Sequence, residues 1–156
     1  MGEILRAAVY CAKPPSLFPR ELHMLADIAR NADDHSGPVL DTDGTVREAR
    51  RGYVRGLGDP KDKLGLKANM LETRMFISTA TGWIQPADGP EHDGAYQLNM
   101  PRLQRLLDAA KAAMATGEPD ADAIAGADRE LPGDFDTQAP DLADQVDRLL
   151  VRNPAT

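Results

Sequence analysis

Residues 19–30 repeat apolar side chains at the spacing of one helical face. The repeating positions, at i, i+3, i+4 and i+7, are Leu22, Leu25, Ala26 and Ala29. Pro19 suits the first position of a helix, because the N–H that proline lacks has no intrahelical partner there. The pattern predicts a helix that begins at Pro19 and ends between Asn31 and Asp34.

Two further amphipathic helices are predicted in the last third of the chain. Pro101 opens the first and Gly117 ends it; its apolar positions are Leu103, Leu106, Leu107, Ala110 and Met114. Pro140-Asp141 opens the second and Asn153-Pro154 ends it; its apolar positions are Leu142, Val146, Leu149 and Leu150. We expect this last apolar face to pack against the main domain, a second subunit or another protein.

Three shorter segments are predicted from weaker patterns. Residues 3–12 place Ile4, Leu5, Ala8 and Val9 on one helical face, although a short strand fits them as well. Val39-Leu40 follows a polar loop and fits a very short strand. Thr45-x-x-Glu48 has the form of a capping box, which predicts a helix from Thr45 to Leu57. We expect the arginines of that helix to lie largely outside its apolar stripe.

The stretch 64–99 predicts a helix, a tight turn, a second helix and a β-hairpin. Leu64-Gly65-Leu66 supplies the turn, and Leu71 and Met75 share a face of the helix that follows. Gly82-Trp83-Ile84 ends that helix and opens a strand. Residues 83–85 and 96–99 can then pair across the turn-rich segment between them.

This order of elements resembles the winged helix-turn-helix superfamily of bacterial and phage DNA-binding proteins. The resemblance covers roughly the first two-thirds of the chain and places the wing at the hairpin. Many members have a short strand as third partner of the wing, which the resemblance puts at Val39-Leu40. The polar segment Pro60–Lys63 departs from the pattern, as does Ser78 at an apolar position. The fold class expected is mainly α with a small β-hairpin wing, a winged helix-turn-helix plus C-terminal helices.

Charge divides the chain into a basic middle and an acidic end. The whole chain carries a formal net charge of −7, but residues 47–74 hold eight bases and four acids. Residues 115–150 hold ten acids and two bases. We expect a winged-helix domain with its flanking helix at 1–116, an acidic flexible linker at 117–140 and a C-terminal helix at 141–153.

The resemblance implies a homodimeric transcriptional regulator that binds double-stranded DNA, and the basic middle of the chain favours DNA binding. Cations displace phosphate counterions, and Asn and Arg side chains can read base edges. The candidate DNA-binding residues are Arg47, Arg50, Arg51, Arg55, Lys67, Asn69, Thr73 and Arg74. The acidic tail would be repelled by DNA and can compete for the basic patch within the molecule.

An acidic wing favours a second interpretation, in which the chain is a protein-binding adaptor or inhibitor. Such proteins occur in phages and mobile elements, and some act against host defences by imitating the charge of DNA. The candidate protein-binding residues are Asp88, Glu91, Asp93, Leu142, Val146 and Leu149. Under this interpretation the acidic wing and the C-terminal helix contact the partner.

Residues for catalysis or metal binding show no recognisable spacing. The histidines His23, His35 and His92 lack metal-type intervals, and His23 with Asp27 fits a surface pair. Cys11 is the only cysteine, so no internal disulfide can form, which fits a reducing cytoplasm. No apolar run approaches the roughly 20 residues of a membrane span. We therefore expect a cytoplasmic protein that is not an enzyme and has no cofactor or metal.

Overall fold

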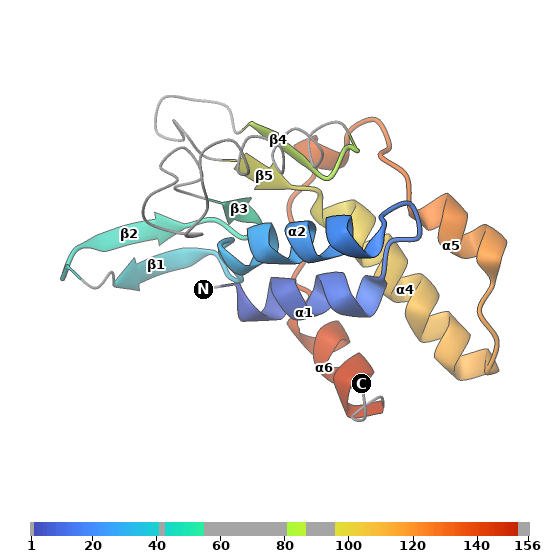
Figure 1. The fold of residues 1–156 in the computed structure, drawn as a ribbon. Helices are drawn as coiled ribbons and strands as arrows, with labels where there is room; N and C mark the ends of the chain where they lie inside the picture. The colour runs from blue at the N-terminus through green and yellow to red at the C-terminus, as the bar shows by residue number, and fades with distance from the viewer. Residues whose placement is uncertain (1, 41–42, 55–80, 87–95, 153–156) are drawn as a thin grey trace.

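The computed structural model describes residues 2–40, 43–54, 81–86 and 96–152. Helices pack around an apolar core, and small antiparallel sheets lie at its edge (Figure 1). Within the described residues, no helix is long and apolar enough to cross a membrane. In chain order the elements are α1 (Glu3–Ala12), α2 (Pro19–Arg30), β1 (Gly37–Leu40), β2 (Val46–Ala49), β3 (Tyr53–Val54), β4 (Ile84–Pro86), β5 (Tyr96–Leu98), α4 (Met100–Thr116), α5 (Ala121–Ala127), η2 (Asp134–Asp136) and α6 (Ala143–Arg152).

The N-terminal segment forms the helix α1, which lies antiparallel to α2 (Figure 1). The Asp34 carboxylate accepts hydrogen bonds from the N–H groups of Ile4 and Leu5 at 3.2 and 3.0 Å, so a residue far along the chain caps α1. A Cβ at Gly2 would lie 2.0 Å from the Ala29 carbonyl oxygen, so glycine permits the close approach of the two helices. Tertiary contacts thus stabilise a helix in a segment whose periodicity fits either a helix or a short strand.

The three helices predicted from clear amphipathic patterns are confirmed as α2, α4 and α6. Pro19 begins α2, as predicted. Asn99 caps α4 by accepting a hydrogen bond from the Arg102 N–H at 3.1 Å, and Gly117 ends α4 in the left-handed region at a φ of 80°. Local patterns and end signals were sufficient for these helices.

The predicted β-hairpin is confirmed, because β4 and β5 pair antiparallel with Ile84 opposite Leu98. β3 adds to the other side of β5, which gives the strand order β3-β5-β4. The third strand was expected at Val39-Leu40. Those residues do form a strand, β1, but it pairs with β2 outside this sheet. Tyr53-Val54 takes the third position instead.

The helix predicted from Thr45 to Leu57 is wrong over its described part, which contains β2 and β3 instead. The Thr45 hydroxyl and N–H both bond to the Asp43 carboxylate, at 2.6 and 2.9 Å, which closes a turn and not a capping box. Gly52 has a φ of 83°, which a helix does not allow. Long-range pairing of β2 with β1 therefore overrides the local helical pattern. We call β1, β2 and their connection the arm; it projects beyond the helices (Figure 1).

Residues 117–140 contain regular structure where the composition predicts an acidic linker. Asp120 caps α5 by accepting from the Ala123 N–H at 3.1 Å, and η2 follows. Ion pairs from α4 to Asp128 and Asp134 hold this segment against α4. The chain passes the three-stranded sheet at η2 and then returns to α6 (Figure 1).

The apolar face of α6 packs against the chain's own core. Leu142, Val146 and Leu149 are buried there, with α1 and α4 as neighbours. Of the three environments considered for this face, the main domain is therefore the observed one. These side chains are not available as the partner-binding surface that the second interpretation assigned to them.

We predict that Leu149→Ala lowers the free energy of unfolding by about 2–4 kcal/mol, because the substitution leaves a cavity in the core. Leu149 is 6% exposed, whereas its neighbour Leu150 is 44% exposed. Leu150→Ala is the matched control and should cost about 0.5 kcal/mol or less. Urea unfolding followed by circular dichroism measures both; equal losses would contradict the burial of this face.

Candidate nucleic-acid interface

The structure describes three of the residues predicted to contact DNA, namely Arg47, Arg50 and Arg51. Arg47 lies on β2 of the arm, and Arg50 and Arg51 lie between β2 and β3, at the base of the arm. The remaining candidates lie outside the described residues: Arg55, Lys67, Asn69, Thr73 and Arg74, together with Asp88, Glu91 and Asp93 of the expected wing.

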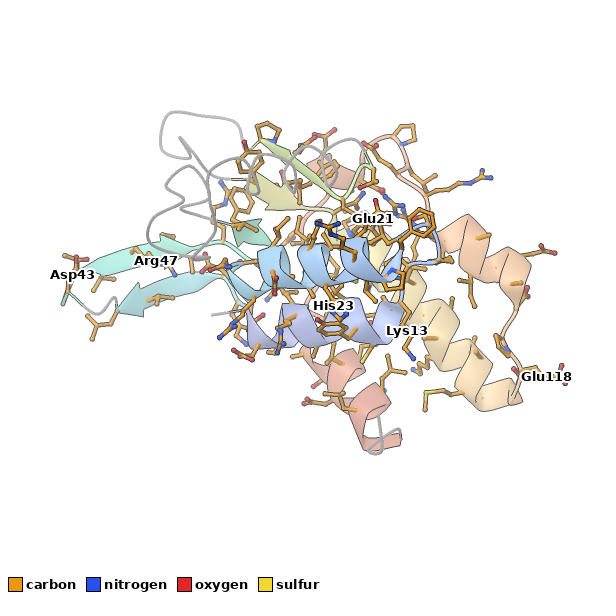
Figure 2. The ribbon with its side chains drawn as sticks, in the orientation of Figure 1. Lys13, Glu21, His23, Asp43, Arg47 and Glu118 are labelled. Carbon is orange, nitrogen blue, oxygen red and sulfur yellow. The ribbon has the colours of Figure 1, made fainter. Side chains whose placement is uncertain are left out.

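Arg47 is held by an internal ion pair. Its two terminal nitrogens donate to the two oxygens of Asp33 at 3.0 and 2.9 Å, a bidentate arrangement. Asp33 also accepts from the Arg50 N–H at 3.3 Å. Figure 2 shows Asp43 at the end of the arm and Arg47 nearer to the body. Arg47 therefore fastens the arm to the end of α2, and much of its charge is already neutralised.

Arg51 connects three parts of the chain. Its Nε donates to the Asp34 carbonyl oxygen at 3.2 Å, and one terminal nitrogen donates to the Ala139 carbonyl oxygen at 3.0 Å. The other terminal nitrogen lies 3.5 Å from the Asp141 carboxylate. The guanidinium group thus joins the base of the arm to the chain just before α6.

Arg50 is exposed, and its guanidinium carbon lies 4.5 Å from the centroid of the Tyr53 ring. A cation over an aromatic face is attracted by the ring quadrupole, which fixes the direction of the side chain. Arg50 therefore presents its charge at the β3 edge of the three-stranded sheet.

The three-stranded sheet has one apolar and one polar face. Val54, Ile84 and Leu98 are buried in the core. On the opposite face, Tyr53, Gln97 and Gln85 form one row across β3, β5 and β4, because the register places them side by side. Amide and phenol groups can both donate and accept hydrogen bonds. The row, which we call the outer face, is suited to contact a polar surface.

Residues 128–141, which we call the acidic strap, pass along this outer face. The Gln97 side-chain amide donates to the Phe135 carbonyl oxygen at 2.8 Å. A cavity of about 330 Å³ lies between Gln85 and strap residues 130–136. The strap therefore covers part of the outer face without packing tightly against all of it.

Two arginines of α4 hold the beginning and the middle of the strap. Arg102 pairs with Asp128 at 2.7 Å and Arg105 pairs with Asp134 at 2.9 Å. Asn99 also donates to Asp134, at 3.1 Å. No pattern in the sequence predicts these pairs. Arg102 and Arg105 stand at i and i+3 on α4, but this spacing does not indicate which acidic residues they bind.

Arg102 is buried, and its guanidinium group donates hydrogen bonds to Asp128 and to a backbone carbonyl oxygen. It donates to the Thr81 carbonyl oxygen at 2.6 Å, and its guanidinium carbon lies 4.2 Å from the centroid of the Trp83 ring. A buried cation must be paired and hydrogen-bonded to be tolerated. The partners of Arg102 therefore fix where the strap begins relative to the sheet.

The environment of Asp134 favours its charged form. Burial raises the pKa of its carboxyl, but hydrogen bonds from Arg105, the Leu131 N–H and Asn99, together with the Arg105 charge, outweigh burial. The pKa of Asp134 consequently lies below its ordinary value. At neutral pH the carboxylate is therefore ionised, as its ion pair with Arg105 requires.

Other candidate chemistry is not assembled into a site. His23 Nδ1 is hydrogen-bonded to the Tyr10 hydroxyl at 2.8 Å on the surface of α1 and α2. Among the described residues, no three His, Cys, Asp or Glu side chains are grouped to hold a metal ion.

No family model matches the sequence, and neither a curated protein nor a solved structure is significantly similar to it.

We predict that Asp134→Asn lowers the free energy of unfolding by about 2 kcal/mol at pH 7, because Arg105 loses a charged partner. A lowered folded-state pKa means that Asp134 stabilises the fold above its unfolded pKa of about 3.9. This stabilisation is lost as the pH falls through the folded-state pKa.

The difference between wild type and Asp134→Asn should therefore be constant above about pH 5 and shrink below about pH 4. Urea unfolding at a series of pH values measures it. Asp136→Asn, in an exposed position two residues away, is the matched control and should show little difference at any pH. A difference for Asp134→Asn that stays unchanged at low pH would contradict the ion pair.

Proposed function

We propose that this chain is a winged helix-turn-helix DNA-binding protein that acts as a transcriptional regulator. The observation that carries the proposal is the strand order β3-β5-β4. A hairpin with a third short strand beside it, preceded by the amphipathic helix α2, is the arrangement expected of a winged fold. The helix-turn-helix expected between β3 and β4 lies outside the described residues.

Charge at the edge of this sheet supports DNA as the partner. Arg50 is exposed at β3, and Arg51 follows it directly. The chain then continues into residues 55–74, whose sequence contains five arginine and lysine residues. Because phosphate neutralisation supplies much of the affinity for DNA, a basic sheet edge beside the expected reading helix is where the backbone would bind.

We predict that the full chain binds duplex DNA at low salt with an affinity that falls steeply as salt rises. Arg50→Ala should weaken binding several-fold and reduce the slope of log K against log salt by about 0.9, the value for one lost phosphate contact. Arg148→Ala removes an equal charge from an exposed position on α6 and is the control. Fluorescence anisotropy with a labelled duplex measures both. No binding at low salt would remove the proposal.

A protein-binding adaptor or inhibitor is a second candidate, and the arm is the observation that favours it. Leu40 and Val46 lie directly opposite each other on β1 and β2 and are 71% and 69% exposed. Two large exposed apolar side chains, side by side on a projecting hairpin, offer a surface that a protein partner could cover. The tip of the arm also carries Asp43, whose pKa is lowered by hydrogen bonds from Thr45.

If the arm binds a protein, the double variant Leu40→Ser with Val46→Ser should lose a partner that wild type and Arg50→Ala both retain. Leu131→Ser changes another exposed leucine, away from the arm, and is the control. Affinity capture followed by mass spectrometry makes the comparison. Partner retention by the double variant would count against a role of the arm in binding.

A further inference from the structure

Arg51 offers an anion-binding position that the chain itself fills. Two of its nitrogens bind the carbonyl oxygens of Asp34 and Ala139, and the third faces the Asp141 carboxylate at 3.5 Å. A carboxylate and a phosphodiester present similar charged oxygens to a guanidinium group. Asp141 therefore occupies a place that a backbone phosphate would suit.

The Asp141 contact is the weakest of those that Arg51 makes. Its distance is the longest of the three, and the Asp141 side chain is 54% exposed, against 19% for Arg51. Exposed ion pairs of this kind contribute little to stability. A phosphate could replace the carboxylate at small cost to the fold.

The buried anchors of the strap lie on both sides of this contact, and at the contact the strap is held by the hydrogen bond from Arg51 to the Ala139 carbonyl oxygen. Asp134 is buried on one side and Leu142 on the other. Between them, no described residue is buried, and Asp136, Thr137 and Gln138 are exposed. A short section of chain can thus move away from Arg51 by breaking the hydrogen bond to the Ala139 carbonyl oxygen, while the ion pairs to α4 and the packing of α6 stay intact.

We propose that Asp141 holds the phosphate-binding position at Arg51, so that the acidic strap competes with DNA for the basic edge of the sheet. This inference rests on the proposed DNA-binding function. Its consequence is autoinhibition within one chain: displacement of the strap at residues 136–141 uncovers Arg51 next to the already exposed Arg50.

The variant Asp141→Asn tests the competition without removing the cap of α6. Asp141 accepts a hydrogen bond from the Ala143 N–H at 3.1 Å, and an Asn oxygen can accept the same bond. The control is Asp147→Asn, which removes the same charge from an exposed position on α6. Circular dichroism and urea unfolding establish that both variants fold like wild type.

Binding of a labelled duplex is measured by fluorescence anisotropy across a salt series. We expect Asp141→Asn to bind about threefold more tightly than Asp147→Asn. Its slope of log K against log salt should be steeper by about 0.9, because Arg51 gains a phosphate contact. Adding Arg51→Ala to Asp141→Asn should abolish both differences.

Two results would overturn the inference, and they can be told apart. If wild type binds duplex DNA but Asp141→Asn and Asp147→Asn behave alike, Asp141 does not compete with phosphate, and the proposed function survives. If neither wild type nor Asp141→Asn binds DNA at low salt, the proposed function fails and this inference fails with it.

Discussion

The buried ion pair between Arg102 and Asp128 is the constraint on which the arrangement of the sheet and strap depends. A buried arginine without a partner is strongly destabilising, so its surroundings must form together or not at all. Arg102 contacts the Trp83 ring and the Thr81 carbonyl oxygen in one segment and Asp128 in another. One side chain of α4 therefore sets the position of the strand β4 and the start of the strap.

Placement of the strap changes how the charge of the chain should be interpreted. Counting charges along the sequence gives a basic middle and an acidic end, as if each were exposed to solvent. In the fold, Arg47 is paired with Asp33, and Arg51 faces Asp141 from the acidic end. Whether an arginine can bind a phosphate thus depends on its partners inside the chain. A DNA interface can use only those cations that internal ion pairs leave accessible.

The arm illustrates how local and long-range preferences compete. Residues 45–57 have an apolar stripe and capping signals that favour a helix, yet β2 pairs with β1 and β3 pairs with β5. Strand pairing satisfies backbone groups in β2 and β3, and Gly52 turns the chain between the two strands at a positive φ. The result is a projecting hairpin with two exposed apolar side chains, a surface that the helical pattern gave no reason to expect.

The sequence by itself determined the features that arise within one short segment: the helices α2, α4 and α6, with the proline and glycine residues at their ends, and the hairpin of β4 and β5. Each depends on a period, a proline or a glycine that local inspection can find. Only the tertiary structure decided the charged partners, because Arg102 with Asp128 and Arg51 with Asp141 are separated by 26 and 90 positions. No periodicity records such pairing, since it is the packing of distant segments that brings the charges together.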